Sequence, residues 1–179
     1  MLRLPVLSAE DRHAPDGYHC VRWRYIKERL SLVGTLFQPD DGGPYPGILL
    51  LGGSEGGLHE DDAALLAAHG YAVLALAYFG MAGVPPLLIG IPLEYGEAAI
   101  AWLREQEGVR GDWLGAMGGS RGGELALLLG VTFPAITPVV NQCGSGVLTE
   151  GIGVTRCPTC PRGCLPHSRP KPAAAALSI

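Results

Sequence analysis

The residues best suited to chemistry form a glycine-rich run around one serine, Gly118-Gly119-Ser120-Arg121-Gly122. An apolar segment, residues 113–117, precedes this run, and a segment of helical character, residues 123–129, follows it. A serine in a tight strand-to-helix turn presents its Oγ as a nucleophile, and glycines two positions away on either side avoid a clash. The spacing predicts that Ser120 attacks a carbonyl carbon and that the backbone N–H of Arg121 stabilises the oxyanion. The alternative is a glycine-rich turn that only packs helix on strand.

A second run of the same pattern, Gly52-Gly53-Ser54-Glu55-Gly56, follows the apolar residues 48–51. The next helical signal starts later, near Leu58, so these glycines predict a loop rather than a sharp turn. Such a loop can supply the second backbone N–H of an oxyanion hole, which makes Ser54 and Glu55 candidate donors and not nucleophiles. The run does not fit G-x-G-x-x-G, and a dinucleotide site is therefore disfavoured.

Strand and helix signals alternate along the chain. Strands are predicted at residues 33–37, 47–51, 71–77, 113–117 and 137–143, and helices at residues 58–69, 92–107 and from the turn at Ser120 to about Gly130. This alternation predicts an α/β fold with a mostly parallel sheet and helices on both of its faces. Residues 85–92 are apolar and broken by proline, which indicates a loop over the sheet and a candidate wall of an acyl pocket.

Composition narrows the class of protein. The chain has 179 residues, of which 47% are hydrophobic and 17% charged, as expected for one globular domain. Residues 1–150 carry all 17 acidic residues and nine of the 13 basic ones, and this acidic balance argues against nucleic-acid binding. No apolar stretch is long enough to span a membrane, and the first residues do not resemble a signal peptide. We therefore expect a cytoplasmic protein with no membrane or nucleic-acid partner and no cofactor.

Three segments carry a resemblance to a known family: LVGTLFQPDDGGPYPGILLLGGSEGGLHEDDAALLAAHGYAVLALAYFG, IPLEYGEAAIAWL and GAMGGSRGGELALLLG. From Leu32 to about Ile152 the chain resembles the C-terminal catalytic domain of the acyl-CoA thioesterase and bile acid-CoA:amino acid N-acyltransferase family. In that family the domain has the α/β-hydrolase fold and is related to the dienelactone hydrolases. The resemblance implies that Ser120 attacks the thioester of an acyl-CoA, releases coenzyme A, and passes the acyl group to water or an amine. A dienelactone hydrolase-like carboxylesterase acting on a small ester is one alternative, and a non-catalytic hydrolase-like scaffold is another.

The remainder of a catalytic triad is harder to place. In these folds the acid and the histidine follow the serine along the chain. After Ser120 the acids are Glu124 and Glu150 and the only histidine is His167. Glu124 belongs to the nucleophile's own helix and cannot orient a base across the site, and Glu150 and His167 match neither of the family's motifs. We expect an N-terminal lead-in at residues 1–31, a partial α/β-hydrolase domain at 32–152 that lacks its C-terminal strands, and a foreign, disordered tail at 153–179, as truncation would produce. This predicts weak activity or none.

The charged residues near the two glycine runs are expected to have ordinary roles. The Arg121 side chain is interpreted as a solvated surface group, with attraction of a coenzyme A phosphate as the alternative. Glu124 suits the first turn of a helix, where a negative charge complements the macrodipole. His59 and His69 are expected to be surface or capping residues of the first helix.

The tail contains four soft ligand types in Cys157, Cys160, Cys164 and His167. Their identity suits zinc, but their spacing is not that of paired zinc knuckles, so no metal site is predicted. Cys20 and Cys143 are expected to be reduced thiols.

Overall fold

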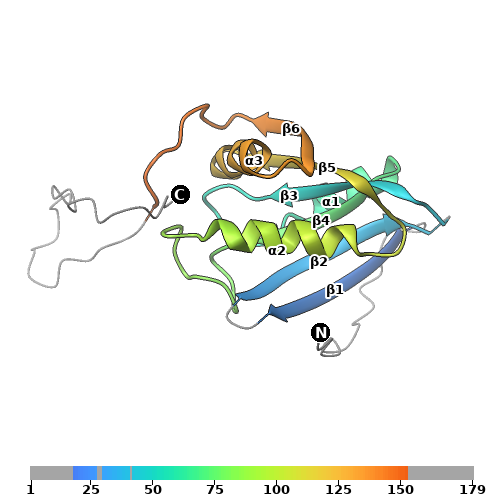
Figure 1. Ribbon diagram of the computed structural model, residues 1–179. Helices are drawn as coiled ribbons and strands as arrows, with labels where there is room; N and C mark the ends of the chain where they lie inside the picture. The colour runs from blue at the N-terminus through green and yellow to red at the C-terminus, as the bar shows by residue number, and fades with distance from the viewer. Residues whose placement is uncertain (1–17, 28–29, 41, 153–179) are drawn as a thin grey trace, which may run out of the picture.

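The computed structural model describes residues 18–27, 30–40 and 42–152, and the side chains from residue 32 onward within these ranges (Figure 1). One six-stranded sheet runs through this part of the chain, with the strand order β1-β2-β4-β3-β5-β6. The elements are β1 Tyr18–Lys27, β2 Leu30–Pro39, β3 Tyr45–Leu51, α1 Glu60–Ala68, β4 Ala72–Ala77, α2 Leu93–Arg104, β5 Val109–Gly119, α3 Arg121–Thr132 and β6 Ile136–Gln142.

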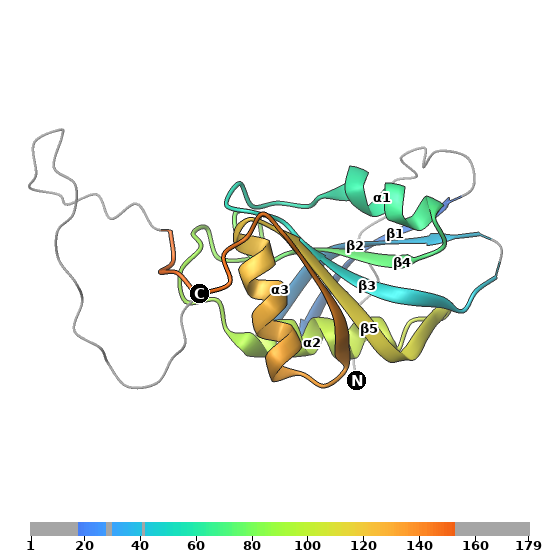
Figure 2. The same ribbon diagram turned by 90° about the horizontal axis from the view of Figure 1, so that it is seen from above.

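The sheet is mixed, with a parallel body. Strands β4, β3, β5 and β6 are parallel to their neighbours in that order, whereas β1 and β2 are antiparallel to each other and β2 is antiparallel to β4. Helix α1 lies on one face, and α2 and α3 lie on the other (Figure 2). The prediction of an α/β fold with a mostly parallel sheet and helices on both of its faces is confirmed.

Burial follows from this layering. All six residues of β4 are buried, as a strand covered on both faces requires. The α1 face has a small core in which Ala63 and Ala67 meet Phe37 and Leu50. The opposite face has the larger core, to which α2 contributes residues spaced by one turn of helix: Tyr95, Ala99, Ile100 and Leu103.

The antiparallel strand β1 lies within residues 1–31, where the sequence analysis placed no strand. It pairs with β2 along its whole length, from Tyr18 opposite Pro39 to Lys27 opposite Leu30. Its sequence alternates apolar and charged residues, as in Val21-Arg22-Trp23-Arg24-Tyr25. This period of two is typical of an antiparallel strand and is the signal that would have identified it. Among the described residues, no helix is long and apolar enough to cross a membrane.

Candidate functional site

Ser120 occupies the junction between β5, which ends at Gly119, and α3, which begins at Arg121. Its backbone has φ 49° and ψ −116°, a positive φ that non-glycine residues rarely adopt. The Ser120 N–H donates to the carbonyl of Gln142 at the end of β6 over 2.9 Å, and the residue is exposed. The strained strand-to-helix turn predicted from the sequence is therefore present.

Close backbone contacts explain the glycines around Ser120. A Cβ on Gly118 would clash with the carbonyl oxygen of Gly122, and a Cβ on Gly122 would clash with the carbonyl oxygens of Leu51 and Gly52. The turn at Ser120 therefore packs directly against the end of β3, where the second glycine run starts. The two runs that the sequence analysis singled out lie side by side at the carboxyl ends of the parallel strands.

A hollow of about 200 Å³ lies between these two runs. Ser120, Gly119, Gly53 and Glu55 all line it, whereas Ser54 is an exposed residue of the same loop. Its other lining residues are Leu50, Leu51, His59, Asp62, Met117 and Gln142. The hollow therefore brings Ser120 together with one of the two loop residues predicted to supply oxyanion donors.

A buried tyrosine holds the start of this loop. The Tyr78 hydroxyl donates to the Gly52 carbonyl over 2.7 Å, and its ring meets Phe79 edge to face. Burial raises the pKa of Tyr78 well above its ordinary value, so the hydroxyl keeps its proton for this bond.

The loop amides hold an anion in this structure. The Glu55 carboxylate accepts the N–H of its own residue, and it accepts the N–H of Gly53 over 2.9 Å. The bond from its own N–H is the main reason that the pKa of Glu55 is lowered. The N–H groups of this loop thus bind the carboxylate of Glu55, which lines the hollow.

His59 lines the same hollow, a position that the sequence analysis did not foresee. It is the N-cap residue of α1, as a capping role predicts, but its side chain makes no capping hydrogen bond. Its Nε2 lies 2.9 Å from Glu55 Oε1 and its Nδ1 lies 3.5 Å from Asp62 Oδ2. Glu55, His59 and Asp62 are spaced four and three residues apart at the start of the helix. This spacing was the sequence signal that could have predicted their cluster.

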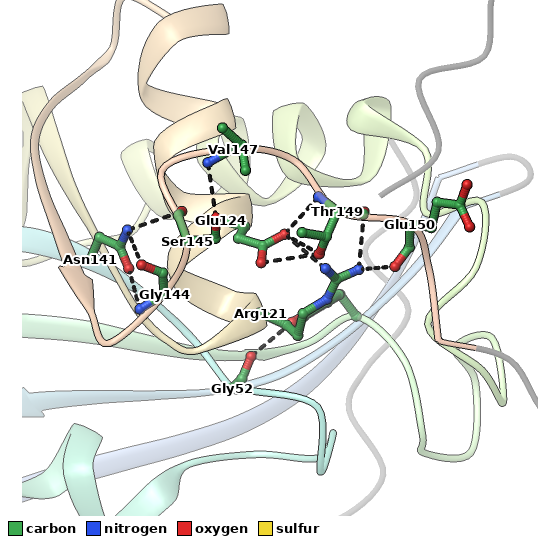
Figure 3. A network of polar contacts seen from close by, with 10 residues as sticks. Gly52, Arg121, Glu124, Asn141, Gly144, Ser145, Val147, Thr149 and Glu150 are labelled. Atoms are coloured by element: carbon green, nitrogen blue, oxygen red, sulfur yellow. Dashed lines mark hydrogen bonds and ion pairs between the residues drawn. The ribbon is translucent and has the colours of Figure 1, made fainter.

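The interpretation of Arg121 as a solvated surface group is wrong. Its side chain is only 8% exposed, and it donates to the Glu124 carboxylate over 2.8 Å (Figure 3). It also donates to the carbonyls of Thr149 and Glu150, over 3.2 and 2.6 Å. Both terminal nitrogens of the guanidinium are therefore engaged within the chain, which also argues against the alternative that it attracts a phosphate of coenzyme A.

Glu124 is buried as well and does more than complement a helix dipole. Its carboxylate accepts the N–H of Thr149 over 3.1 Å and the hydroxyl of Thr149 over 2.9 Å (Figure 3). Earlier in the segment after β6, the Asn141 side chain accepts the N–H of Gly144 and donates to the carbonyl of Ser145. Residues 149 and 150 are thus tied to the start of α3.

The other predicted positions add no catalytic group. His69 is exposed and bonds the carbonyl of Leu65 in its own helix, as a surface role predicts. Cys143 is exposed with a free thiol. In the described part of the chain, no group of three or more metal-ligating side chains is found. The tail positions Cys157, Cys160, Cys164 and His167 lie outside the described residues.

Comparison with known proteins supports the family resemblance of the C-terminal part of the chain. Residues 91–169 match the family described as BAAT / Acyl-CoA thioester hydrolase C terminal. This match agrees with the family resemblance that the sequence carries. The match continues past residue 152, where the sequence analysis places the end of the resemblance, into residues that the structure does not describe.

Named relatives agree with the family. The chain is 36% identical to acyl-coenzyme A thioesterase 1 of Rattus norvegicus, over 84% of this chain and 38% of that protein. It is 43% identical to the mitochondrial acyl-coenzyme A thioesterase 2 of Mus musculus, over 78% of this chain and 34% of that protein. The chain therefore spans little more than a third of the length of these relatives. Both are named as thioesterases, so the family is one of enzymes.

A solved structure supports the fold. The putative dienelactone hydrolase from Klebsiella pneumoniae superimposes with a TM-score of 0.62, covering 75% of this chain and 63% of that chain. At 17% sequence identity this likeness establishes the α/β-hydrolase fold alone.

Proposed function

We propose that this chain is an acyl-CoA thioester hydrolase domain in which Ser120 is the nucleophile. The observation that carries the proposal is the position of Ser120, exposed in a strained turn on the hollow that Gly53 and Glu55 also line. Ser120 Oγ attacks the thioester carbonyl, the C–S bond breaks, and coenzyme A leaves as the thiol. Water or an amine then takes the acyl group from the serine ester. Acyl-CoA metabolism is the setting that the relatives' names support.

The oxyanion donors are proposed to be the backbone N–H groups of the loop around Glu55 together with that of Arg121. The first N–H groups of a helix lack intrahelical partners, and Arg121 is the first residue of α3, directly after Ser120. The bound Glu55 carboxylate supports the loop's part of this assignment, because it occupies the kind of site an oxyanion needs. The Glu55 side chain would have to move away when the substrate binds.

The base that activates Ser120 is not assigned. Among the described side chains His59 is the one histidine on the hollow, and both of its ring nitrogens face carboxylates rather than a free space. A serine without a base reacts slowly, although an oxyanion hole and substrate binding alone leave a residual acceleration on the order of 10³–10⁴ over water in serine proteases. From the described side chains alone we therefore expect weak turnover.

The test is thiol release from a medium-chain acyl-CoA, run beside hydrolysis of p-nitrophenyl acetate and with Ser120→Ala as the matched control. We expect slow release of coenzyme A that Ser120→Ala removes, with less activity on the simple ester. Activity on the ester alone would instead favour the dienelactone hydrolase-like carboxylesterase. Rates for both substrates that do not change with Ser120→Ala would contradict a serine nucleophile and favour a non-catalytic scaffold.

A further inference from the structure

Arg121 and Glu124 are the two buried charged side chains in the described part of the chain. Removing two charges from water is costly, and an apolar pair of similar volume often stabilises a protein as well or better. Arg121 Nε is in addition buried with no hydrogen-bond partner among the described residues. Fold stability alone is therefore a weak explanation for an ion pair that starts directly after Ser120.

The pair's contacts show what it holds. Arg121 reaches the carbonyls of Thr149 and Glu150, and Glu124 accepts both the N–H and the hydroxyl of Thr149. Both charged side chains, which come from the first turn of α3, thus contact one short segment, residues 149 and 150 (Figure 3). We call this arrangement of Arg121, Glu124 and Thr149 the clasp.

The segment that the clasp binds also contacts the turn at Ser120. A Cβ on Gly144 would clash with the Ser120 carbonyl oxygen, so the chain leaving β6 passes directly against the turn. Further along the same segment, the clasp fixes residues 149 and 150 to the first turn of α3. The backbone of Ser120 and Arg121 is therefore held between the β6 exit and the clasped segment.

We propose that Arg121 and Glu124 are positioning residues for acyl transfer, which fix the first turn of α3 so that the Arg121 N–H stays directed at the oxyanion. This inference rests on the proposed function. The side chains act through the backbone and do not touch the substrate. Because an oxyanion exists only after attack, loss of the clasp should weaken binding of the tetrahedral state and leave binding of the ground state unchanged.

The test compares two coenzyme A analogues on the full chain: a trifluoromethyl ketone, which forms a tetrahedral adduct with serine, and a thioether, which cannot. The variants are Glu124→Gln, Arg121→Lys, and the double variant Arg121→Met with Glu124→Leu, which restores apolar packing without charge. Asp112→Asn is the matched control, because it removes one carboxylate from the exposed Arg110–Asp112 pair. Hydrogen exchange of the Thr149 N–H reports on the clasp itself.

We expect Glu124→Gln and the double variant to bind the ketone about tenfold or more weakly, with thioether binding unchanged. The Thr149 N–H should exchange faster in both variants. In the double variant it should do so even when the melting temperature equals that of the wild type. Arg121→Lys, which keeps the charge, should regain part of the ketone affinity, and Asp112→Asn should match the wild type.

Two results would overturn the clasp's role. Equal weakening of both analogues would mean that the pair only supports the fold, and a double variant with full ketone affinity would mean that the charges position nothing. Failure of the proposed function looks different, because Ser120→Ala would then leave the ketone's affinity unchanged in the otherwise wild-type chain. In that case the inference falls with the function on which it rests.

Discussion

Ser120 is held in its backbone conformation by its neighbours, because φ 49° with ψ −116° is unfavourable for any residue with a Cβ. A non-glycine residue in such a region costs on the order of 1–3 kcal/mol, and it persists where the surrounding packing leaves no alternative. The glycines at 118 and 122 provide that packing, since each lies in contact with backbone carbonyl oxygens. The strain exposes the hydroxyl at the hollow.

This strain predicts that Ser120→Gly stabilises the domain. Glycine adopts positive φ without a Cβ penalty, so the free energy of unfolding should rise by about 1 kcal/mol. Ser120→Ala keeps the Cβ and is the control that should leave stability nearly unchanged. Urea denaturation of the three proteins measures the difference. A Ser120→Gly variant no more stable than Ser120→Ala would mean that the turn is not strained.

At the scale of elements, Tyr95 connects helix α2 to strands β2 and β4. It extends from α2, its hydroxyl accepts the N–H of Val33 in β2 over 3.2 Å, and it donates to the carbonyl of Ala77 at the end of β4. Burial raises the pKa of Tyr95 to about 12, while its N–H bond from Val33 acts in the opposite direction.

The raised pKa predicts a loss of stability in alkaline solution. Below about pH 10 the hydroxyl is protonated in both the folded and the unfolded chain, so its contribution is fully present. Between pH 10 and about 12 the unfolded chain releases this proton first, and the free energy of unfolding therefore falls as pH rises. Tyr95→Phe should be less stable at pH 7 and should lose less stability over that alkaline interval. A pH series of urea denaturation curves tests this, and identical slopes for both proteins would contradict it.

Local patterns predicted the elements that position the site, and long-range contacts decided the rest. The turn at Ser120 depends on glycines within two residues of it, so the sequence identified it directly. The burial of Arg121 depends on carbonyls at 149 and 150, far along the chain, which no local pattern reveals. Strand β1 was missed although its alternation of apolar and charged residues is a local signal of an antiparallel strand. His59 was placed correctly at a helix start, but only the packing of α1 shows that it lines the hollow.

At the scale of the whole molecule, β6 forms one edge of the sheet and, in the described part, pairs with β5 alone. Its Val140 side chain is 52% exposed. An exposed strand edge with apolar side chains invites pairing with another chain.

We therefore predict that Val140→Lys reduces self-association of the isolated chain, because a charge on an edge strand blocks edge-to-edge pairing. Val131→Lys is the control, since Val131 is even more exposed but lies on α3 and not on a strand. Sedimentation velocity at several protein concentrations distinguishes them. Equal effects of both substitutions would show that general solubility, and not the edge of β6, governs association.

The most direct test of Ser120 as the nucleophile is mass spectrometry of the chain after incubation with an acyl-CoA. Trypsin cleaves after Arg110 and Arg121, and the resulting peptide, residues 111–121, contains Ser120 as its only serine and has no cysteine or lysine. When the reaction is stopped with acid during turnover, we predict one acyl group on this peptide in the wild-type chain and none in Ser120→Ala. An acyl group found only on the peptide that carries Cys143, or no Ser120-dependent adduct at all, would contradict the proposed mechanism.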